Sequence, residues 1–181
     1  GQLWLEHTGH RIVRFFQCPT ILRVFSNMLR ILSTVAIALM PLNTLSASED
    51  ASTVLVGGTS YTVNQLEREF DQVTIHTVST WTQDRIIEYT GPALLDVADK
   101  SGLAGQSGLK LTSADEYSVT VPRNEAELYQ PIIAIRVDGQ RIGFEDKGPA
   151  RMVWPRSQYP DEIGAAQDGY WLWYLISVSE N

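Results

Sequence analysis

Cysteine is almost absent from this 181-residue sequence, and its single copy, Cys18, stands near the beginning. Residues 48–181 contain none, which excludes disulfide bonds and thiolate-bound metals from that part of the chain. Long apolar runs are missing too, since none approaches the roughly 20 residues of a membrane-spanning helix. The sequence after residue 47 therefore predicts neither a disulfide-stabilised domain nor a transmembrane span.

Histidine is equally scarce, because residues 48–181 contain only His76. A serine–histidine–aspartate mechanism would have to use this side chain, and no Gly-x-Ser-x-Gly motif accompanies it. Glycine-rich phosphate or dinucleotide loops are missing as well, and no spacing of carboxylates around His76 indicates a metal site. His76 lies in a predicted strand, which favours a hydrogen-bonded structural role. We identify no catalytic residue.

A basic start, an apolar stretch and a small residue follow one another near the beginning of the chain. Met28-Leu29-Arg30 precedes the apolar residues 31–42, and Ala47 suits the last position before a cleavage site. This order predicts a secretory signal peptide over residues 28–47, with cleavage after Ser46 as the alternative, and export to the periplasm. Residues 1–27 precede the first methionine and are expected to be either a misassigned start or a long basic leader.

The remaining residues, 48–181, have the length of one common domain. They carry 20 acidic and 10 basic side chains, a net charge of −10. Such an acidic balance argues against a general surface for nucleic acid or anionic membranes. We expect one exported domain without a transmembrane span.

Strand patterns outnumber helical ones in this domain. Thr62 and Gln65 form a possible capping box for a short helix through Phe70, and Pro92 suits the start of a second helix that Gly102 would end. Asp138-Gly139 is typical of a tight hairpin turn. The predicted strands cover residues 53–56, 73–78, 84–89, 109–113, 117–121, 132–137, 140–142, 151–154 and 171–178, with a third short helix over 124–129. The fold class is therefore α+β with a strand-dominated mixed sheet.

One stretch of ten residues in this acidic domain contains three cations, Lys147, Arg151 and Arg156. Arginine binds phosphate or carboxylate through two parallel hydrogen bonds, so the cluster indicates an anion site. The alternative pairs these cations at the surface with the acidic residues Glu145, Asp146 and Asp161, which would contribute little. Spacing alone leaves both readings open.

Trp81 stands in a polar turn, residues 80–83, where a large indole is unexpected unless it packs against something. It could stack on a flat heterocycle, as aromatic side chains do on nucleic-acid bases. The alternative is that Trp81 covers the core, which is the role expected for Trp154, Trp171 and Trp173.

Several segments of the domain share their order and spacing with a known family. They are residues 74–81, 89–95, 112–117 and 131–139, the last leading into 147–155. In this order they resemble the sulfite oxidase type of molybdopterin-binding domain over most of residues 73–178. The run Gly148-Pro149-Ala150-Arg151-Met152-Val153-Trp154-Pro155 is the most specific part. The resemblance implies the SUOX fold, a mixed sheet with a barrel-like core and short helices.

One position departs from that family. Its enzymes hold molybdenum through a cysteine thiolate. In members with a Cys-x-x-x-Trp arrangement this cysteine falls four residues before the tryptophan, where the present sequence has Thr77. A threonine hydroxyl cannot replace a soft thiolate on the metal, so the resemblance implies a pocket that keeps a pterin, or a molybdopterin-like ligand, without molybdenum. It places Thr77, His76, Asp115 and Tyr117 in that pocket with Trp81 and the cations Lys147, Arg151 and Arg156.

Small exported proteins of this kind resemble periplasmic pterin-binding regulators, which act on membrane-bound cyclic-di-GMP enzymes through their periplasmic domains. The leading hypothesis is a non-catalytic, ligand-sensing pterin-binding protein, in which Asp115 accepts hydrogen bonds from the pterin. Two alternatives remain. One is a molybdopterin-dependent oxidoreductase or its subunit, and the other is an interaction module with a vestigial pocket.

Overall fold

The computed structural model describes residues 52–83 and 85–181. These residues fall within one compact unit and confirm the predicted α+β class, with strand-dominated mixed sheets and few short helices. The predicted leader and signal peptide, residues 1–47, lie outside the described part of the chain. No helix of the described part is long and apolar enough to cross a membrane.

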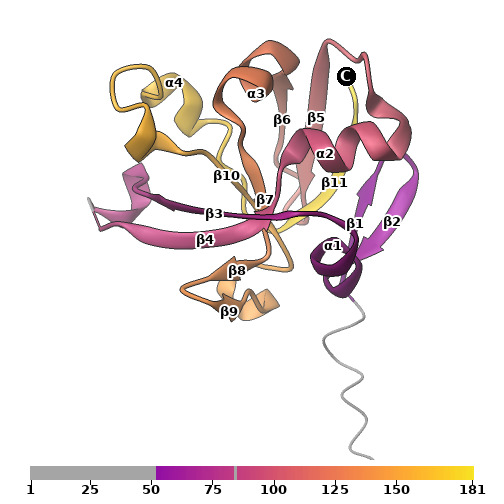
Figure 1. Cartoon of the computed structure of the whole chain (residues 1–181), viewed down its shortest axis with the longest axis horizontal. Coiled ribbons are helices and arrows are strands. Elements are labelled where there is room, and N and C mark those ends of the chain that lie inside the picture. Colours follow the sequence, from indigo (N-terminus) through magenta and orange to yellow (C-terminus); the bar gives the residue numbers. More distant parts are fainter. Residues whose placement is uncertain (1–51, 84) are drawn as a thin grey trace, which may run out of the picture. The chain divides into compact units, whose positions relative to one another are not determined.

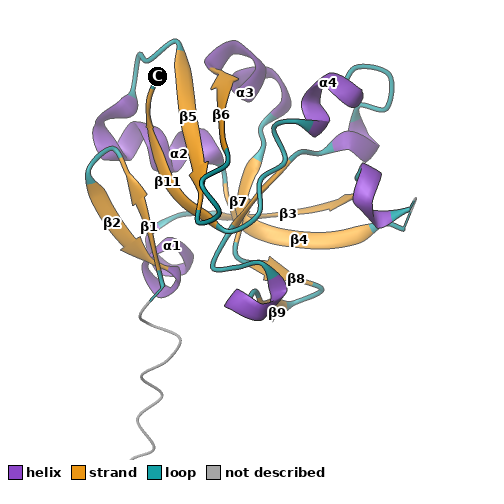
Figure 2. Ribbon diagram, turned by 180° about the vertical axis from the view of Figure 1, so that it is seen from behind, coloured by secondary structure: helices purple, strands orange, loops and turns teal. Residues whose placement is uncertain are grey.

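The largest sheet has five strands in the order β2-β1-β11-β5-β6 (Figures 1 and 2). Its strands alternate in burial, as a sheet with one covered face requires, so that Val54 and Val56 are buried between exposed neighbours. β1 and β11 run parallel, while the other neighbours are antiparallel. The bounds are Thr53–Val56 for β1, Thr59–Thr62 for β2, Gly108–Ser113 for β5, Ser118–Pro122 for β6 and Leu175–Glu180 for β11.

Two smaller sheets complete the described strands. The first has the order β3-β4-β8-β9, and the second pairs β10 with β7. In Figures 1 and 2, β3 and β4 extend side by side away from the five-stranded sheet, with the β8–β9 hairpin next to them. The bounds are Gln72–Thr77 for β3, Ile87–Pro92 for β4, Ile132–Ala134 for β7, Arg136–Val137 for β8, Gln140–Arg141 for β9 and Arg151–Val153 for β10. The described strands form three separate sheets and no closed barrel, so the expected barrel-like core is not found.

The strand predicted over residues 132–137 is divided at Ile135. β7 pairs with β10 before it, and β8 pairs with β4 and β9 after it. The Ile135 N–H donates to the Thr90 carbonyl at 2.9 Å, and the Ile135 carbonyl accepts from Ile142 at 3.1 Å. The hairpin predicted at Asp138-Gly139 is confirmed, with φ of 48° and 75° at these two residues. One continuous apolar run thus serves two sheets.

Gly91 lies where β4 passes close to β7. A Cβ atom built on it would lie 1.9 Å from the Ile133 carbonyl oxygen, far inside van der Waals contact. Glycine is therefore required at this position, because only its missing side chain lets the two backbones approach.

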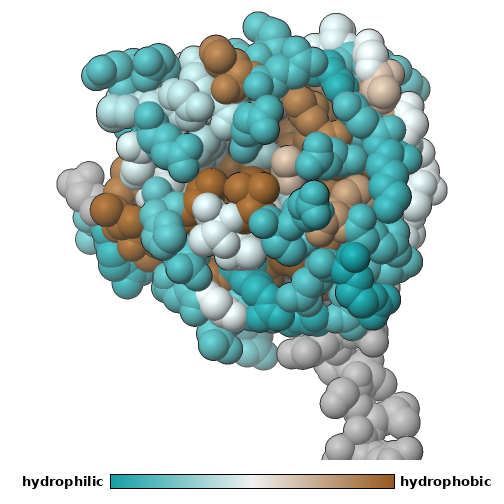
Figure 3. All heavy atoms as spheres, viewed as in Figure 1, coloured by the Kyte–Doolittle hydropathy of each residue, from teal (hydrophilic) through white to brown (hydrophobic). Residues whose placement is uncertain are grey.

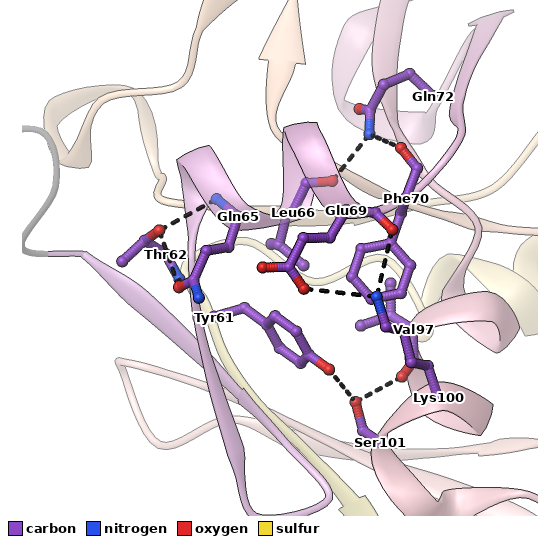
Figure 4. A network of polar contacts seen from close by, with 10 residues as sticks. All are labelled: Tyr61, Thr62, Gln65, Leu66, Glu69, Phe70, Gln72, Val97, Lys100 and Ser101. Carbon is purple, nitrogen blue, oxygen red and sulfur yellow. Dashed lines mark hydrogen bonds and ion pairs between the residues drawn. The ribbon is translucent and has the colours of Figure 1, made fainter.

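The helices are short, and α1, Val63–Glu69, begins with a side-chain cap, whereas the helices that start at Leu94 and Arg123 do not. Thr62 and Gln65 form the predicted capping box of α1 (Figure 4). Phe70 is the C-cap residue that follows this helix. Next to α1, the hydroxyl groups of Tyr61 and Ser101 are hydrogen-bonded at 3.0 Å. The other helices are α2, Leu94–Ala98, α3, Arg123–Tyr129, and α4, Ala165–Asp168.

Three predicted boundaries are wrong. Pro92 is the last residue of β4, and α2 begins only after Ala93 because the chain stays extended there to pair with β3. β4 starts at Ile87, later than predicted. The last strand starts at Leu175, because Tyr174 adopts a positive φ of 53° that interrupts the extended backbone.

One hydrophobic cluster joins the sheets and the helices. Trp154 is fully buried and Trp171 nearly so, as predicted for core residues. The same prediction is wrong for Trp173, which is only partly buried and lies outside the core cluster, where its ring meets that of the half-exposed Trp81. Figure 3 shows hydrophobic residues among polar ones on one face of the molecule. Trp81 is half exposed, although its ring approaches that of the buried Trp171.

Candidate functional site

A pocket of about 610 Å³ lies beside Trp81. One wall comes from β4 and the segment that joins β3 to β4. The others come from β8 with the turn that follows it, from β10 with the loop before it, and from the residues before β11. The lining residues are Ser79, Trp81, Thr82, Arg85, Ile87, Tyr89, Val137, Asp138, Glu145, Asp146, Lys147, Arg151 and Trp173. The pocket brings together Trp81, Lys147 and Arg151, three of the residues predicted to bind ligand.

Trp81 is held by a short 3-10 turn, Thr80–Thr82. The Ser79 N–H donates to the Thr82 hydroxyl at 2.9 Å, and the Thr82 N–H donates to the Ser79 carbonyl at 3.1 Å. The Trp81 ring is 49% exposed and meets the Trp173 ring edge-on, with 4.8 Å between the ring centroids. This turn presents a large aromatic surface to solvent at the pocket wall.

Arg156 is engaged next to this turn and lies outside the lining of the pocket. Its Nη1 donates to an Asp168 carboxylate oxygen at 2.8 Å and to the Thr80 hydroxyl at 3.2 Å. The Thr80 hydroxyl in turn donates to Asp168. These contacts tie the turn that carries Trp81 to the end of α4, so the structure gives Arg156 a positioning role.

Lys147 and Arg151 reach the pocket from either side of the Gly148-Pro149 dipeptide. The ammonium of Lys147 lies over the Trp173 ring, 4.0 Å from its centroid. A guanidinium nitrogen of Arg151 donates to the Asp146 carbonyl, while its Nε is buried and has no hydrogen-bond partner. A buried charged donor without an acceptor is costly. Arg151 as a whole is a lining residue of the pocket.

Two further residues, Arg85 and Tyr89, also line this pocket. Burial raises the pKa of the Tyr89 hydroxyl, and the charge of Asp138 adds to this. The charge of Arg151, a hydrogen bond with its side chain and the charge of Arg85 partly offset the increase. Tyr89 is therefore uncharged at neutral pH and can donate a hydrogen bond. Tyr89 belongs to one of the segments that carry the family resemblance, whereas no sequence signal distinguishes Arg85.

The charges in the pocket are mixed. Asp138, Glu145 and Asp146 line it together with the three cations. Among residues 52–83 and 85–181, no ion pair joins these carboxylates to Arg85, Lys147 or Arg151. The three cationic groups thus remain available to an anionic group.

A second pocket, of about 390 Å³, shares Trp81 and Trp173 with the first. It contains Asp115 and Tyr117, so these two predicted site residues lie together but apart from Lys147 and Arg151. Hydrogen bonds from the Ser113 hydroxyl and the Tyr117 N–H lower the pKa of the Asp115 carboxyl group. The remaining lining residues are Ser113, Asp168, Gly169, Trp171 and Leu172.

His76 and Thr77 line neither pocket. The exposed His76 ring approaches Glu88, with 3.2 Å between Nε2 and Oε2. Thr77 is fully buried, and its hydroxyl oxygen accepts the Ser157 N–H at 3.1 Å. The strand β3 therefore directs His76 to solvent and Thr77 to the 3-10 turn Arg156–Gln158.

The described residues contain no group of three or more histidine, cysteine, aspartate or glutamate side chains placed to hold a metal ion. The chemistry these pockets offer is aromatic stacking, hydrogen bonding and charge. No protein-family model matches the sequence, and no curated protein matches it with significance.

Proposed function

We propose that this protein binds a pterin carrying an anionic group in the pocket beside Trp81, and that it acts as a ligand-sensing protein without catalysis. The observation that carries this proposal is the lining itself, which combines the half-exposed indole of Trp81 with the cations Arg85, Lys147 and Arg151. None of these three cations has an ion pair among the described residues. A ligand with a flat ring and an anionic group would contact both.

The aromatic part of the proposal depends on Trp81. Stacking between an aromatic side chain and a flat heterocycle contributes about 1–3 kcal/mol per ring in nucleic-acid sites. Trp173 holds the Trp81 ring edge-on, so the indole is positioned before ligand arrives. A pterin ring has the size and flatness that such a surface favours.

The anionic part of the proposal depends on Arg151, Lys147 and Arg85. Each charge-assisted hydrogen bond to a phosphate or carboxylate contributes about 1.5–3 kcal/mol where water is excluded. Arg151 offers the guanidinium that forms paired hydrogen bonds, and Lys147 offers a point charge. The acidic neighbours Glu145 and Asp146 favour ligands that carry one compact anionic group over polyanions.

The test is a fluorescence titration of the purified protein with 6-carboxypterin, a pterin with one carboxylate. We expect saturable binding that Arg151→Ala weakens at least tenfold, because the carboxylate loses its charge-assisted partner. Trp81→Ala should weaken binding by a similar factor. The matched control is Arg68→Ala, which removes an exposed arginine of α1 outside both pockets.

Two outcomes would reject this function. One is the absence of any pterin in extracts of the native protein together with no binding of added 6-carboxypterin. The other is stoichiometric molybdenum with redox turnover, which would support the oxidoreductase alternative. If Arg151→Ala leaves the affinity for 6-carboxypterin unchanged, the ligand binds outside this pocket.

The setting of this binding is part of the proposal. We place the protein in the periplasm after removal of residues 28–47, where it would act on the periplasmic domain of a membrane-bound cyclic-di-GMP enzyme, as the family resemblance implies. Mass spectrometry of the protein from a periplasmic fraction should give a first residue near Ser48. A protein found only in the cytoplasm with an intact leader would contradict this.

A further inference from the structure

We propose that the second pocket, which shares the Trp81 and Trp173 rings with the first, binds a small quaternary ammonium ion. This proposal does not require that a pterin binds in the first pocket. The pocket of about 390 Å³ has room for such an ion. Its aromatic lining, its charge and the contacts already made by its rings favour this ligand.

Four aromatic side chains line this pocket, namely Trp81, Tyr117, Trp171 and Trp173. Trp81 and Tyr117 are each 49% exposed, although large aromatic groups normally gain from burial. The centroids of the Trp81 and Trp171 rings lie 6.5 Å apart, with 55° between the ring planes. The rings therefore border the pocket from different directions, an arrangement suited to a cation held by several aromatic faces.

The charge of the second pocket is the opposite of what an anion needs. Its lining contains two carboxylates, Asp115 and Asp168, and neither lysine nor arginine. Asp168 is neutralised by Arg156 at 2.8 Å. Asp115 accepts the Tyr117 N–H at 3.2 Å and has no ion pair with any cation of the described residues. One uncompensated negative charge thus remains at the aromatic lining.

The protein already places a cation against this aromatic wall. From the side of the first pocket, the Lys147 ammonium lies 4.0 Å from the centroid of the Trp173 ring. Tryptophan is the best partner for such cation–π contacts. The same wall on the side of Asp115 carries no cation from the lining residues, so it can accept one from solution.

The shortage of acceptors selects the type of cation. A primary ammonium has three N–H donors that need acceptors. Of the two lining carboxylates only Asp115 is without an ion pair among the described residues, because Asp168 accepts from Arg156 and Thr80. A quaternary ammonium has no N–H donor and needs only aromatic faces and a nearby negative charge. The lining therefore favours a trimethylammonium group over a lysine-like one.

The test is a titration of the full chain with choline chloride at constant ionic strength, followed by tryptophan fluorescence and calorimetry. We expect saturable binding with a Kd on the order of millimolar, as a few cation–π contacts provide. Asp115→Asn should weaken binding about fivefold and Tyr117→Ala by a similar factor. The control Glu116→Gln changes an exposed neighbour outside the lining and should stay within about twofold of the parent protein.

Uncharged and primary-amine probes separate the remaining possibilities. The neutral isostere 3,3-dimethyl-1-butanol should bind at least about tenfold more weakly than choline. Equal binding of the two, no saturation by choline, or no effect of Asp115→Asn would overturn the proposal. Tighter binding of n-butylammonium than of choline would overturn the choice of a quaternary group. Arg151→Ala should leave choline affinity within about twofold while it weakens 6-carboxypterin binding at least tenfold, so the failure of one proposal can be distinguished from the failure of the other.

Discussion

Arg151 combines a structural position with an unsatisfied side chain. Its backbone is fixed in β10, opposite Ala134 of β7. Its guanidinium donates to the Asp146 carbonyl, yet the buried Nε has no partner. Leaving a buried donor unpaired costs about 1–3 kcal/mol, and more for a charged group. The ligand-free protein therefore carries a local cost at the residue expected to bind the anion.

This cost leads to a prediction about stability. Arg151→Met keeps much of the side-chain volume and removes the unpaired donor, so we expect the free energy of unfolding to stay equal or to rise by up to about 1 kcal/mol. Arg136→Met is the matched control, because it breaks a satisfied pair with Glu67 and should lower stability by about 1 kcal/mol. Chemical denaturation measures both. A loss above about 2 kcal/mol in Arg151→Met would show that Arg151 supports the fold itself.

At the scale of elements, α1 is joined to the β8–β9 hairpin by one carboxylate. The Glu67 oxygen Oε1 accepts from Arg136 at 2.7 and 2.9 Å, and Oε2 accepts from Arg141. The hydrogen bond from Arg136 lowers the pKa of Glu67, burial opposes this, and the contact with Arg141 adds to the lowering. The hairpin whose Val137 lines the first pocket thus depends on an ionised side chain of α1.

The sign of this pKa change predicts how stability responds to acid. A carboxylate with a lowered pKa in the folded state stabilises the protein above its unfolded pKa, and this contribution is lost as the pH falls through the folded value. At pH 7 the free energy of unfolding of the parent protein should be about 1 kcal/mol higher than that of Glu67→Gln. The difference should shrink below about pH 4.5, the ordinary value for glutamate. Denaturant unfolding at several pH values measures it, and a difference that grows in acid would contradict this account.

A second link between elements positions the ligand-binding surface. Asp168 at the end of α4 accepts from Arg156 and Thr80, and Thr80 begins the turn that carries Trp81. α4 lies near the end of β3 in both ribbon views (Figures 1 and 2). Because Trp81 belongs to both pockets, this link affects both proposed ligands.

At the scale of the described domain, the three sheets share one hydrophobic cluster. β1 and β11 bring the first and last strands together in parallel, and Gly91 lets β4 approach β7. Elements that contribute to one continuous core normally unfold together. None of the three described sheets has a separate core on which it could remain folded by itself.

We therefore expect one cooperative unfolding transition. Tryptophan fluorescence, which reports on Trp154 and Trp171 in the core and Trp81 at the pockets, should change at the same denaturant concentration as far-UV circular dichroism. A saturating ligand should shift both curves together by the same amount. Two separated transitions would mean that the pocket region unfolds independently of the five-stranded sheet.

Much of the local structure could be predicted because it depends on neighbouring residues. The Thr62 and Gln65 capping box and the Asp138-Gly139 hairpin are of this kind, since their hydrogen bonds and φ angles involve only a few consecutive residues. The boundaries at Pro92 and Tyr174 were missed because distant strands decide where pairing ends.

The sequence by itself determined the α+β class, the cysteine-free acidic domain and the unusual position of Trp81 in a polar turn. Periodicity and composition carry that information. Only the tertiary structure placed Arg85, Tyr89 and Trp173 beside Lys147 and Arg151, and Asp115 and Tyr117 in a second pocket that shares Trp81 and Trp173 with the first. These groupings depend on how β4, β10 and the residues before β11 meet, a consequence of packing between segments far apart in the chain that no local pattern records.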